Sequence, residues 1–331
     1  MTQEQNKERV LSGMRPTGAL HLGHYVGVIK NWIELQKSYE CFLFLADWHA
    51  LTSNFDEIDM IKKSRIEYIR GWLASGIDVD KAIIYCQSAI PEILMLSQVF
   101  LCLTPPGWAD RSPSWKDFQS NSNANNKLDN LGFYTYPILQ AADIAIVRGN
   151  WVPVGEDQVP HVEIAREVIR KFNRLYKTNL PEPAPKLTAT SKLAGIDGAL
   201  KMSSSIGNVI SLFEDEKSLQ KKINKIKTDD KRQGVESPGD PNNCTVFSYH
   251  KVFSKAELCN EVDGLCRGAK LSCGECKSKL GKSMKEELLP ISEKSRQISD
   301  KDCLEVLHEG NLKAGKIIKN EWNNLKEKIG F

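Results

Sequence analysis

The segment His21–His24, which reads HLGH, combines two histidines and a glycine in a spacing suited to phosphate binding. On a helix, residues three apart lie on one face, so His21 and His24 can reach the same phosphate. Backbone N–H groups at a helix start attract anions, and Gly23 has no side chain to keep a flat base or ribose away. A short motif of this kind also occurs as a polar patch without a ligand. Its position in the fold must therefore support the hypothesis.

The predicted secondary structure places this segment where parallel α/β sheets bind nucleotides. Arg9–Gly13 is predicted to form the first strand, and Pro16–Gly18 forms a turn that breaks strand and helix periodicity. Apolar residues then recur at helical spacing, at Leu22, Val26, Ile29 and Ile33. His21–His24 therefore occupies the first turn of the helix that follows the first strand, at the ligand-binding edge of the sheet.

Further strands alternate with helices and predict an α/β fold with a doubly wound parallel sheet. Cys41–Asp47 is a continuous apolar run that ends in a charge, which is typical of a buried parallel strand. Its carboxyl end delivers Asp47, Trp48 and His49 to the ligand-binding edge. Asp56–Ser75 is predicted to be a helix, and Ala82–Cys86 is predicted to be another buried strand.

A second polar face is predicted within Phe133–Arg148. Tyr136, Gln140 and Asp143 fall at i, i+4 and i+7, on one face of a helix expected to begin after Pro137. They would carry a hydroxyl, an amide and a carboxylate toward one small polar ligand. Asp143 lies among alanines and isoleucines, which favours a buried carboxylate that needs a hydrogen-bond donor. The alternative is a capped helix with a solvated polar face.

The segments around this helix supply connections and one more strand. Ile93–Leu103 is predicted to be a helix, and 105–130 is either a mobile loop or short helices over the site, or a plain surface connection. Val152–Val154 is a short strand, with a polar turn at 155–158 after it, and 162–170 is a helix.

The last third of the chain has a different character. Lysine-rich helices begin at Glu214, and three helices are expected after residue 243, the last over Leu304–Ile329. We place a boundary near Phe213, with α/β structure before it and an all-helical domain after it.

Composition limits the class of protein. The chain has 331 residues, enough for about two domains, with 41% hydrophobic and 26% charged residues and a net charge of +3. No apolar run approaches the roughly 18 residues of a membrane span, and the polar N-terminus lacks the apolar core of a signal peptide. These features indicate no membrane association and a cytoplasmic, reducing location. The nine cysteines are therefore expected to be free thiols or metal ligands rather than disulfides.

Five motifs together resemble the bacterial tryptophanyl-tRNA synthetases, a family of class I aminoacyl-tRNA synthetases. They are SGMRPTG, HLGH, YPILQAADI, VPVGEDQ followed by HVE, and KMSSS, and they span Leu11–Ser205. The resemblance implies a Rossmann-like catalytic domain over 1–212, with a dimer-interface insertion at about 85–150. It also implies a helical tRNA anticodon-binding domain over 213–310, a C-terminal helix at 311–331 that packs back on the catalytic domain, and a homodimer.

The family's reaction has two steps and needs no covalent enzyme intermediate. The carboxylate of L-tryptophan attacks the α-phosphorus of ATP, which gives tryptophanyl-adenylate and pyrophosphate with the help of Mg²⁺. The tryptophanyl group then passes to the terminal ribose of tRNA(Trp). Positioning and electrostatic stabilisation of the crowded phosphate are the expected sources of catalysis.

The resemblance assigns roles to individual positions. The catalytic residues are His21, His24 and Lys201. ATP is implied to contact Arg15, Pro16, Thr17, Gly23, His24, Gly155, Glu156, Asp157, Lys201, Met202, Ser203, Ser204 and Ser205. Tryptophan is implied to contact Leu11, Gly13, His49, Tyr136, Gln140, Asp143, Val152, Val154 and Gln158. Among these, Asp143 would accept the indole N–H, and Tyr136 and Gln158 would hold the α-amino group.

Three positions depart from the family pattern. Ser204 stands where the family has a second lysine, so the pyrophosphate clamp lacks one charge, and Lys116 or Arg15 is a candidate replacement. Arg15 stands where a glutamine is common. Gln140 stands where many bacterial members have methionine, and the resulting Tyr-x3-Gln-x2-Asp pattern also resembles tyrosyl-tRNA synthetase, which is the nearest alternative.

The helical part contains a cysteine pattern that predicts a metal centre. Cys266, Cys273 and Cys276 have six and two residues between them, and twenty-one residues separate Cys244 from Cys266. Some members of the family hold a [4Fe–4S] cluster on a pattern one residue longer in its first spacer. Cys259 is an alternative fourth ligand, and Zn²⁺ or free thiols are alternative states. A function of another class is a metal- or redox-regulated RNA-binding module without catalysis.

Overall fold

The computed structural model describes residues 7–120, 126–187, 193–200, 202–204 and 206–331. Its centre is a five-stranded sheet in which neighbouring strands pair in parallel. The strands are β1 (Arg9–Met14), β2 (Glu40–Leu45), β3 (Ala82–Cys86), β4 (Trp151–Val154) and β5 (Ala184–Leu187). Their order is β3-β2-β1-β4-β5. The predicted doubly wound α/β fold is confirmed.

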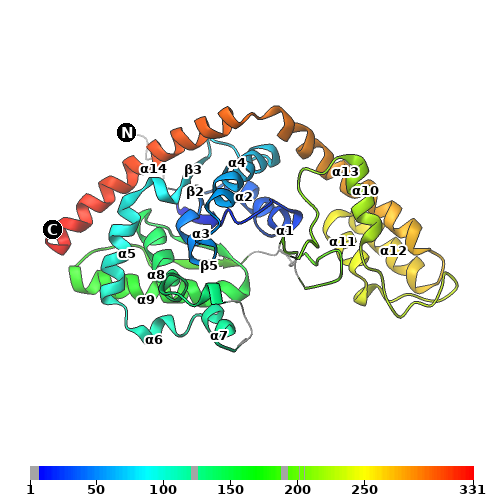
Figure 1. Cartoon of the computed structure of the whole chain (residues 1–331), viewed down its shortest axis with the longest axis horizontal. Coiled ribbons are helices and arrows are strands. Elements are labelled where there is room, and N and C mark those ends of the chain that lie inside the picture. The colour runs from blue at the N-terminus through cyan, green and yellow to red at the C-terminus, as the bar shows by residue number, and fades with distance from the viewer. Residues whose placement is uncertain (1–6, 121–125, 188–192, 201, 205) are drawn as a thin grey trace.

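Helices cover the sheet and make up the rest of the described chain (Figure 1). Their bounds are α1 Leu22–His24, α2 Lys30–Leu35, α3 Asp47–Asn54, α4 Ile58–Ser75, α5 Pro91–Leu103, α6 Pro106–Ala109, α7 Pro113–Ser120, α8 Leu131–Ile146, α9 Val159–Tyr176, α10 Glu216–Lys225, α11 Thr245–Phe253, α12 Ala256–Arg267, α13 Cys273–Gln297 and α14 Asp300–Ile329. A π-helical segment, Tyr25–Ile29, joins α1 to α2, so the predicted first helix is continuous but locally wider.

The sheet order creates the crevice in which a ligand can bind. From β1 the chain builds outward through β2 and β3, then returns to the other side of β1 for β4 and β5. Connections therefore leave β1 and β4 in opposite directions, which opens a space beyond their carboxyl ends. The predicted site segments follow these two strands.

Two local predictions were wrong. The helix expected to begin after Pro137 begins at Leu131, because the Asn130 side chain accepts a hydrogen bond from Phe133 N and caps an earlier start. Pro137 therefore lies inside α8, where it removes one helical hydrogen bond. The second strand ends at Leu45 rather than at Asp47, which begins α3.

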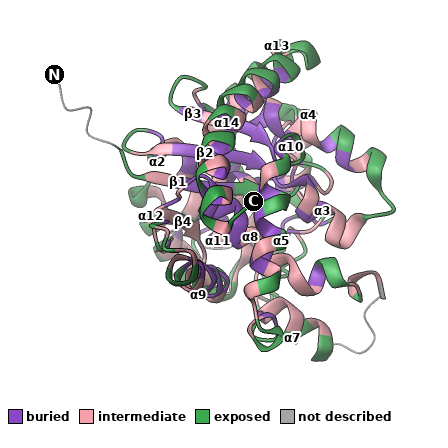
Figure 2. Cartoon of the chain, turned by 90° about the vertical axis from the view of Figure 1, so that its left-hand side faces the viewer, coloured by how far each residue is buried: buried purple, intermediate pink, exposed green. Residues whose placement is uncertain are grey.

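Two hydrophobic cores lie on opposite faces of the sheet, because successive side chains of a strand point to opposite sides. Val10 belongs to one core and Leu11 to the other. The first core continues beyond the sheet to Ile223 and Met284 in the helical part, so the two parts of the chain share buried apolar surface. Figure 2 shows the buried strands enclosed by helices with exposed outer faces.

The C-terminal part differs from the prediction in its number of helices. Residues 244–331, all of which are described, form four helices rather than three. The last two, α13 and α14, run across the top of the molecule in Figure 1 from the helical part to the sheet. None of the described helices is both long and apolar enough to span a membrane.

Helix α14 lies against the outer edge of β3. The Cys86 backbone N–H donates to Asn311 Oδ1 at 2.8 Å. A Cβ atom at Gly310 would lie 1.6 Å from the carbonyl oxygen of Ile84, so only glycine lets the helix come this close. The helix continues through residue 311, where the domain boundary was expected, and its C-terminal half packs in the second core through Ala314, Ile318, Trp322 and Leu325.

Candidate active site

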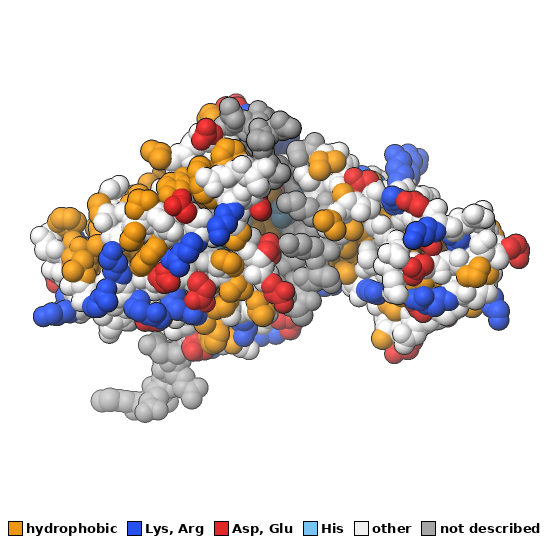
Figure 3. Space-filling view, turned by 90° about the horizontal axis from the view of Figure 1, so that it is seen from below, with side chains coloured by type: hydrophobic (Ala, Val, Ile, Leu, Met, Phe, Trp, Pro, Cys, Tyr) orange, Lys and Arg blue, Asp and Glu red, His pale blue; other side chains and the backbone are white. Residues whose placement is uncertain are grey.

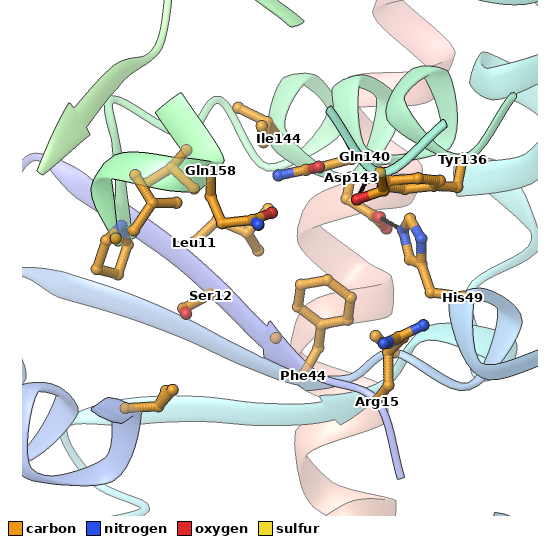
Figure 4. A pocket seen from close by; sticks show the side chains of 18 of the residues that line it. Leu11, Ser12, Arg15, Phe44, His49, Tyr136, Gln140, Asp143, Ile144 and Gln158 are labelled. Carbon is orange, nitrogen blue, oxygen red and sulfur yellow. Dashed lines mark hydrogen bonds and ion pairs between the residues drawn. The ribbon is translucent and has the colours of Figure 1, made fainter. Parts of the chain in front are cut away.

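A cavity of about 710 Å³ opens at the carboxyl ends of β1 and β4, beneath α8 (Figure 4). This volume is in the range of sites that enclose small molecules. Ten of the positions implied for ligand binding line it together: Leu11, Gly13, Arg15, His49, Tyr136, Gln140, Asp143, Val152, Val154 and Gln158. Gly155 lines it as well. The sequence had distributed these residues over almost 150 positions.

Asp143 is a buried carboxylate at the α8 wall of the cavity. Its side chain is 0% exposed, and Oδ2 lies 2.9 Å from His49 Nε2, which must carry the proton because a carboxylate only accepts. Gln87 Nε2 donates to both carboxylate oxygens at 2.9 Å. Burial raises the pKa of Asp143, and the bonds from His49 and Gln87 oppose that rise. Because Oδ1 accepts only one of these bonds, it can take one more donor from a ligand.

Two more residues support this wall: Gln87, which was not predicted, and Asp47, which was predicted to lie at the ligand-binding edge but without a role. Gln87, just after β3, accepts the backbone N–H of His49 through Oε1 while it donates to Asp143. Asp47 accepts from the Ser88 backbone N–H and from Arg65 Nη1, and so ties α3 to the end of β3. No pattern in the sequence pairs these residues, because each bond spans 18 or more positions.

A second polar network lies behind the cavity wall. Tyr136 Oη lies 2.6 Å from His161 Nε2, and Gln158 Oε1 lies 2.9 Å from His161 Nδ1. His161 belongs to the HVE segment, which was predicted only as part of a motif. His161 itself is fully buried and therefore supports the residues that line the cavity.

His21 and His24 cap the first helix reciprocally. His21 Nδ1 accepts from the Gly23 backbone N–H at 3.1 Å, and His24 Nδ1 accepts from the His21 backbone N–H at 3.3 Å. Since Nδ1 is an acceptor in both rings, Nε2 carries the proton in both neutral rings. Burial lowers the pKa of His21 to about 4 and that of His24 to about 3. The two neutral rings, whose centroids lie 3.9 Å apart, therefore each carry one Nε2–H donor.

The described residues of the KMSSS motif lie against the segment that contains the HLGH motif and the turn before it. A Cβ at Gly23 would lie 3.6 Å from Met202 Cβ, and one at Gly18 would lie 3.5 Å from Ser204 Cβ. Buried Asn208, which was not among the predicted site residues, accepts the Ser203 backbone N–H at 2.7 Å. Lys201 and Ser205 lie outside the described residues. Met202 therefore lies beside the start of α1, and Ser204 lies beside the turn that follows β1.

Several predicted ATP contacts do not line the cavity. Glu156 and Asp157 are exposed in a short 3₁₀ turn after β4, and Pro16 and Thr17 lie in the turn after β1. Of the two candidate replacements for the missing lysine, Arg15 lines the cavity and Lys116 does not.

Four of the five candidate cysteine ligands converge. Cys244, Cys266, Cys273 and Cys276 line one small cavity, together with Arg232 and Gly239. Cys259 instead lies in a separate cavity and donates to the carbonyl oxygen of His250. The geometry therefore selects Cys244 rather than Cys259 as the fourth member.

Comparisons with known proteins agree with this geometry. The family model for class I tRNA synthetases (W and Y) matches residues 3–288. A relative from Thermotoga maritima named tryptophan–tRNA ligase is 43% identical over 313 residues, which cover 93% of this chain and 95% of the relative. The crystal structure of tryptophanyl-tRNA synthetase from Campylobacter jejuni complexed with ADP and tryptophan is 32% identical, with a TM-score of 0.85, and covers 98% of this chain and 100% of that one.

A tyrosyl-tRNA synthetase from Archaeoglobus fulgidus is also similar in structure. It is 21% identical, with a TM-score of 0.68, and covers 88% of this chain and 92% of that one. At this level of identity the likeness concerns the fold alone.

Proposed function

Because this chain belongs to the class I tRNA synthetases of the tryptophan and tyrosine family, we propose that it is a tryptophan–tRNA ligase. It activates L-tryptophan with ATP to tryptophanyl-adenylate and pyrophosphate, and then transfers tryptophan to tRNA(Trp). The observation that carries the proposal is a buried carboxylate with a free acceptor position, Asp143, in a cavity beside the two nucleotide motifs.

Different residues of the cavity would bind the indole ring and the α-amino group of tryptophan. Asp143 Oδ1 would accept the indole N–H, while Leu11, Val152 and Val154 offer apolar contacts to the ring. Tyr136 and Gln158 would hold the α-amino group. His49 fixes the Asp143 carboxylate through its Nε2–H.

The nucleotide end relies on neutral donors. The Nε2–H groups of His21 and His24 would stabilise charge on the phosphates as the bond to the leaving pyrophosphate breaks. Lys201 with Ser203 and Ser205 would hold the pyrophosphate, and Arg15 would supply the charge that Ser204 lacks. Mg²⁺ would accompany the ATP phosphates, since this ion is commonly held by substrate phosphates rather than by an all-protein cage.

Tryptophan-dependent exchange between ATP and labelled pyrophosphate tests the assignment. We expect exchange with tryptophan and none with tyrosine, because an indole N–H satisfies the buried Asp143 acceptor. Exchange with tyrosine alone would identify the tyrosyl alternative. Absence of exchange with either amino acid would support the RNA-binding module without catalysis.

The wider organisation is proposed on the same basis. The helical part over 213–310 would bind the tRNA anticodon, and residues 311–331 would attach it to the catalytic domain over 1–212. The protein would act in the reducing cytoplasm, where cysteines rarely form disulfides.

A homodimer is supported by apolar surface on the α/β half. Hydrophobic side chains are denser there than on the helical half when the molecule is seen from below (Figure 3). Phe55, Met95 and Leu131 are 52%, 47% and 79% exposed, near a cleft between α3, α5 and α8. Apolar patches of this kind on a soluble protein mark association surfaces.

The four converging cysteines support a [4Fe–4S] cluster. Burial and the neighbouring thiols raise the pKa of Cys276 to about 12, so this thiol would become a thiolate ligand only beside a positive charge such as an iron ion. A Cβ atom at Gly239 would lie 2.6 Å from Cys266 Sγ, so any larger residue would crowd this sulfur. Glycine keeps the space beside the sulfur open.

The spacing of the same cysteines favours a cluster over Zn²⁺. Structural zinc sites often use two Cys-x2-Cys pairs, and only Cys273 and Cys276 have that spacing here. The group would stiffen the helical part and takes no part in the two reaction steps.

Metal analysis of anaerobically purified protein tests the cluster. We expect brown protein with about four irons and four sulfides per chain, as four thiolates hold this cluster type. Cys273→Ser should lose the iron, while Cys259→Ser, the matched control from the neighbouring cavity, should keep it. Colourless protein with one zinc, or folded protein without metal, would contradict the proposal.

A further inference from the structure

His161 joins two residues that line the tryptophan end of the cavity but does not line the cavity itself. It lies on α9, is 0% exposed, and uses both ring nitrogens. Nε2 lies 2.6 Å from Tyr136 Oη and 3.1 Å from Ser112 Oγ, and Nδ1 lies 2.9 Å from Gln158 Oε1. A single neutral ring can donate from one nitrogen and accept at the other.

The neighbours of Gln158 decide which nitrogen donates. Gln158 Nε2 donates to Asp157 Oδ2 at 3.2 Å, so the amide oxygen must face His161. That oxygen only accepts, and His161 Nδ1 must therefore carry the proton. His161 Nε2 is then an acceptor, and the Tyr136 hydroxyl, 2.6 Å away, donates its only proton to it. The Ser114 hydroxyl, which lies 3.1 Å from Tyr136 Oη, must therefore donate to that oxygen.

This arrangement sets the polarity of the cavity wall. Because Tyr136 gives its proton to His161 and accepts from Ser114, Oη presents to a ligand only its remaining lone pair. Gln158 Oε1 also keeps a second lone pair. Two acceptors therefore face the space where a ligand's α-ammonium group, which only donates, would lie.

We propose that His161 is a positioning residue that selects the α-ammonium group of the amino-acid substrate, by fixing Tyr136 and Gln158 as acceptors. The inference rests on the proposed tryptophan activation. A positively charged His161 would donate from both nitrogens and turn the Tyr136 proton toward the ligand. Burial lowers the pKa of His161 to about 4, against a smaller opposing effect of Asp157, so the ring stays neutral at physiological pH.

The test compares L-tryptophan with indole-3-propionate, which has the same ring and carboxylate but no amino group. Calorimetry should show that His161→Leu binds tryptophan roughly 10- to 100-fold more weakly, the usual range for losing a hydrogen bond to a charged group. Binding of indole-3-propionate should stay at the wild-type level. His161→Gln should restore part of the preference, because its Oε1 can replace Nε2 as the acceptor for Tyr136.

A double-mutant cycle separates this role from general packing. Tyr136→Phe should weaken tryptophan binding in the wild type but add little in His161→Leu, since the two residues act as one unit. Tyr134→Phe is the matched control, because its hydroxyl bonds to Pro106 O and Asp110 on the outer side of α8. Its effect should be the same in both backgrounds.

The outcomes distinguish the inference from the function on which it rests. Equal losses for tryptophan and indole-3-propionate in His161→Leu would make the residue merely structural, and an unchanged preference would also overturn the inference. If the wild-type protein bound no tryptophan, the proposed function itself would fail.

Discussion

Replacing Asp143 with asparagine is expected to lower kcat/KM for tryptophan by up to about 10⁴-fold, with little change in KM for ATP. The reason is the donor set around the carboxylate. His49 and Gln87 both donate to Asp143, and the indole N–H would be a further donor. Asparagine has one acceptor oxygen and one NH₂ group. In either orientation of the amide, its NH₂ group would face an N–H donor of His49, Gln87 or the indole in a buried site.

Steady-state exchange kinetics with tryptophan and with benzothienylalanine, in which sulfur replaces the indole N–H, measure this effect. The wild type should prefer tryptophan strongly, and the variant should lose most of that preference. Asp47→Asn is the matched control, because Asp47 is a buried carboxylate at the same edge that does not line the cavity. It should lower stability without changing the preference. A collapse of ATP binding with tryptophan selection intact would contradict the role of Asp143.

His21→Asn is expected to lower kcat for adenylate formation by about 100- to 1,000-fold, the usual cost of removing one donor to a developing charge. Asparagine is among the best helix N-caps, so its oxygen can replace His21 Nδ1 as the acceptor for the Gly23 N–H. The variant thus keeps the cap and loses only the Nε2–H donor. Single-turnover adenylation, measured beside thermal unfolding, separates the two effects.

The matched control for this variant is His21→Gln. Its longer amide can place an N–H near the former Nε2 position, so part of the lost rate should return. An unchanged kcat in His21→Asn would show that the ring serves only as a cap. A large fall in unfolding temperature would instead attribute the loss to the helix.

The bounds of a strand or helix were predicted correctly where nearby residues alone determine them. The bounds of β3 were predicted correctly, because Ala82–Cys86 is an apolar run between clear turns. β5 was missed, because APKL has neither alternation nor an apolar run. The start of α8 was misplaced, because the cap at Asn130 outweighed the helix-breaking signal of Pro137.

Site residues were predictable where a motif carried them and not where a contact did. His49 and Asp143 are 94 positions apart, and the sequence predicted that both face the ligand but not that they bond to each other. Gln87 has no local signal, and His161 was marked only as part of the HVE motif, since the roles of both arise only when strand ends and helices meet. Likewise, spacing allowed either Cys244 or Cys259 as the fourth cysteine, and only packing distinguished them.

The contact between α14 and β3 has a consequence for how the chain is made. β3 is an edge strand, and Asn311, which bonds to Cys86 N, is translated 225 residues after its partner. At typical synthesis rates, β3 is made roughly 10 to 45 s before the part of α14 that covers its outer edge. Until then its unpaired backbone groups can pair with other nascent chains. Transcripts cut short before the Gly310 codon would therefore yield products prone to aggregation, even though the whole sheet had been synthesised.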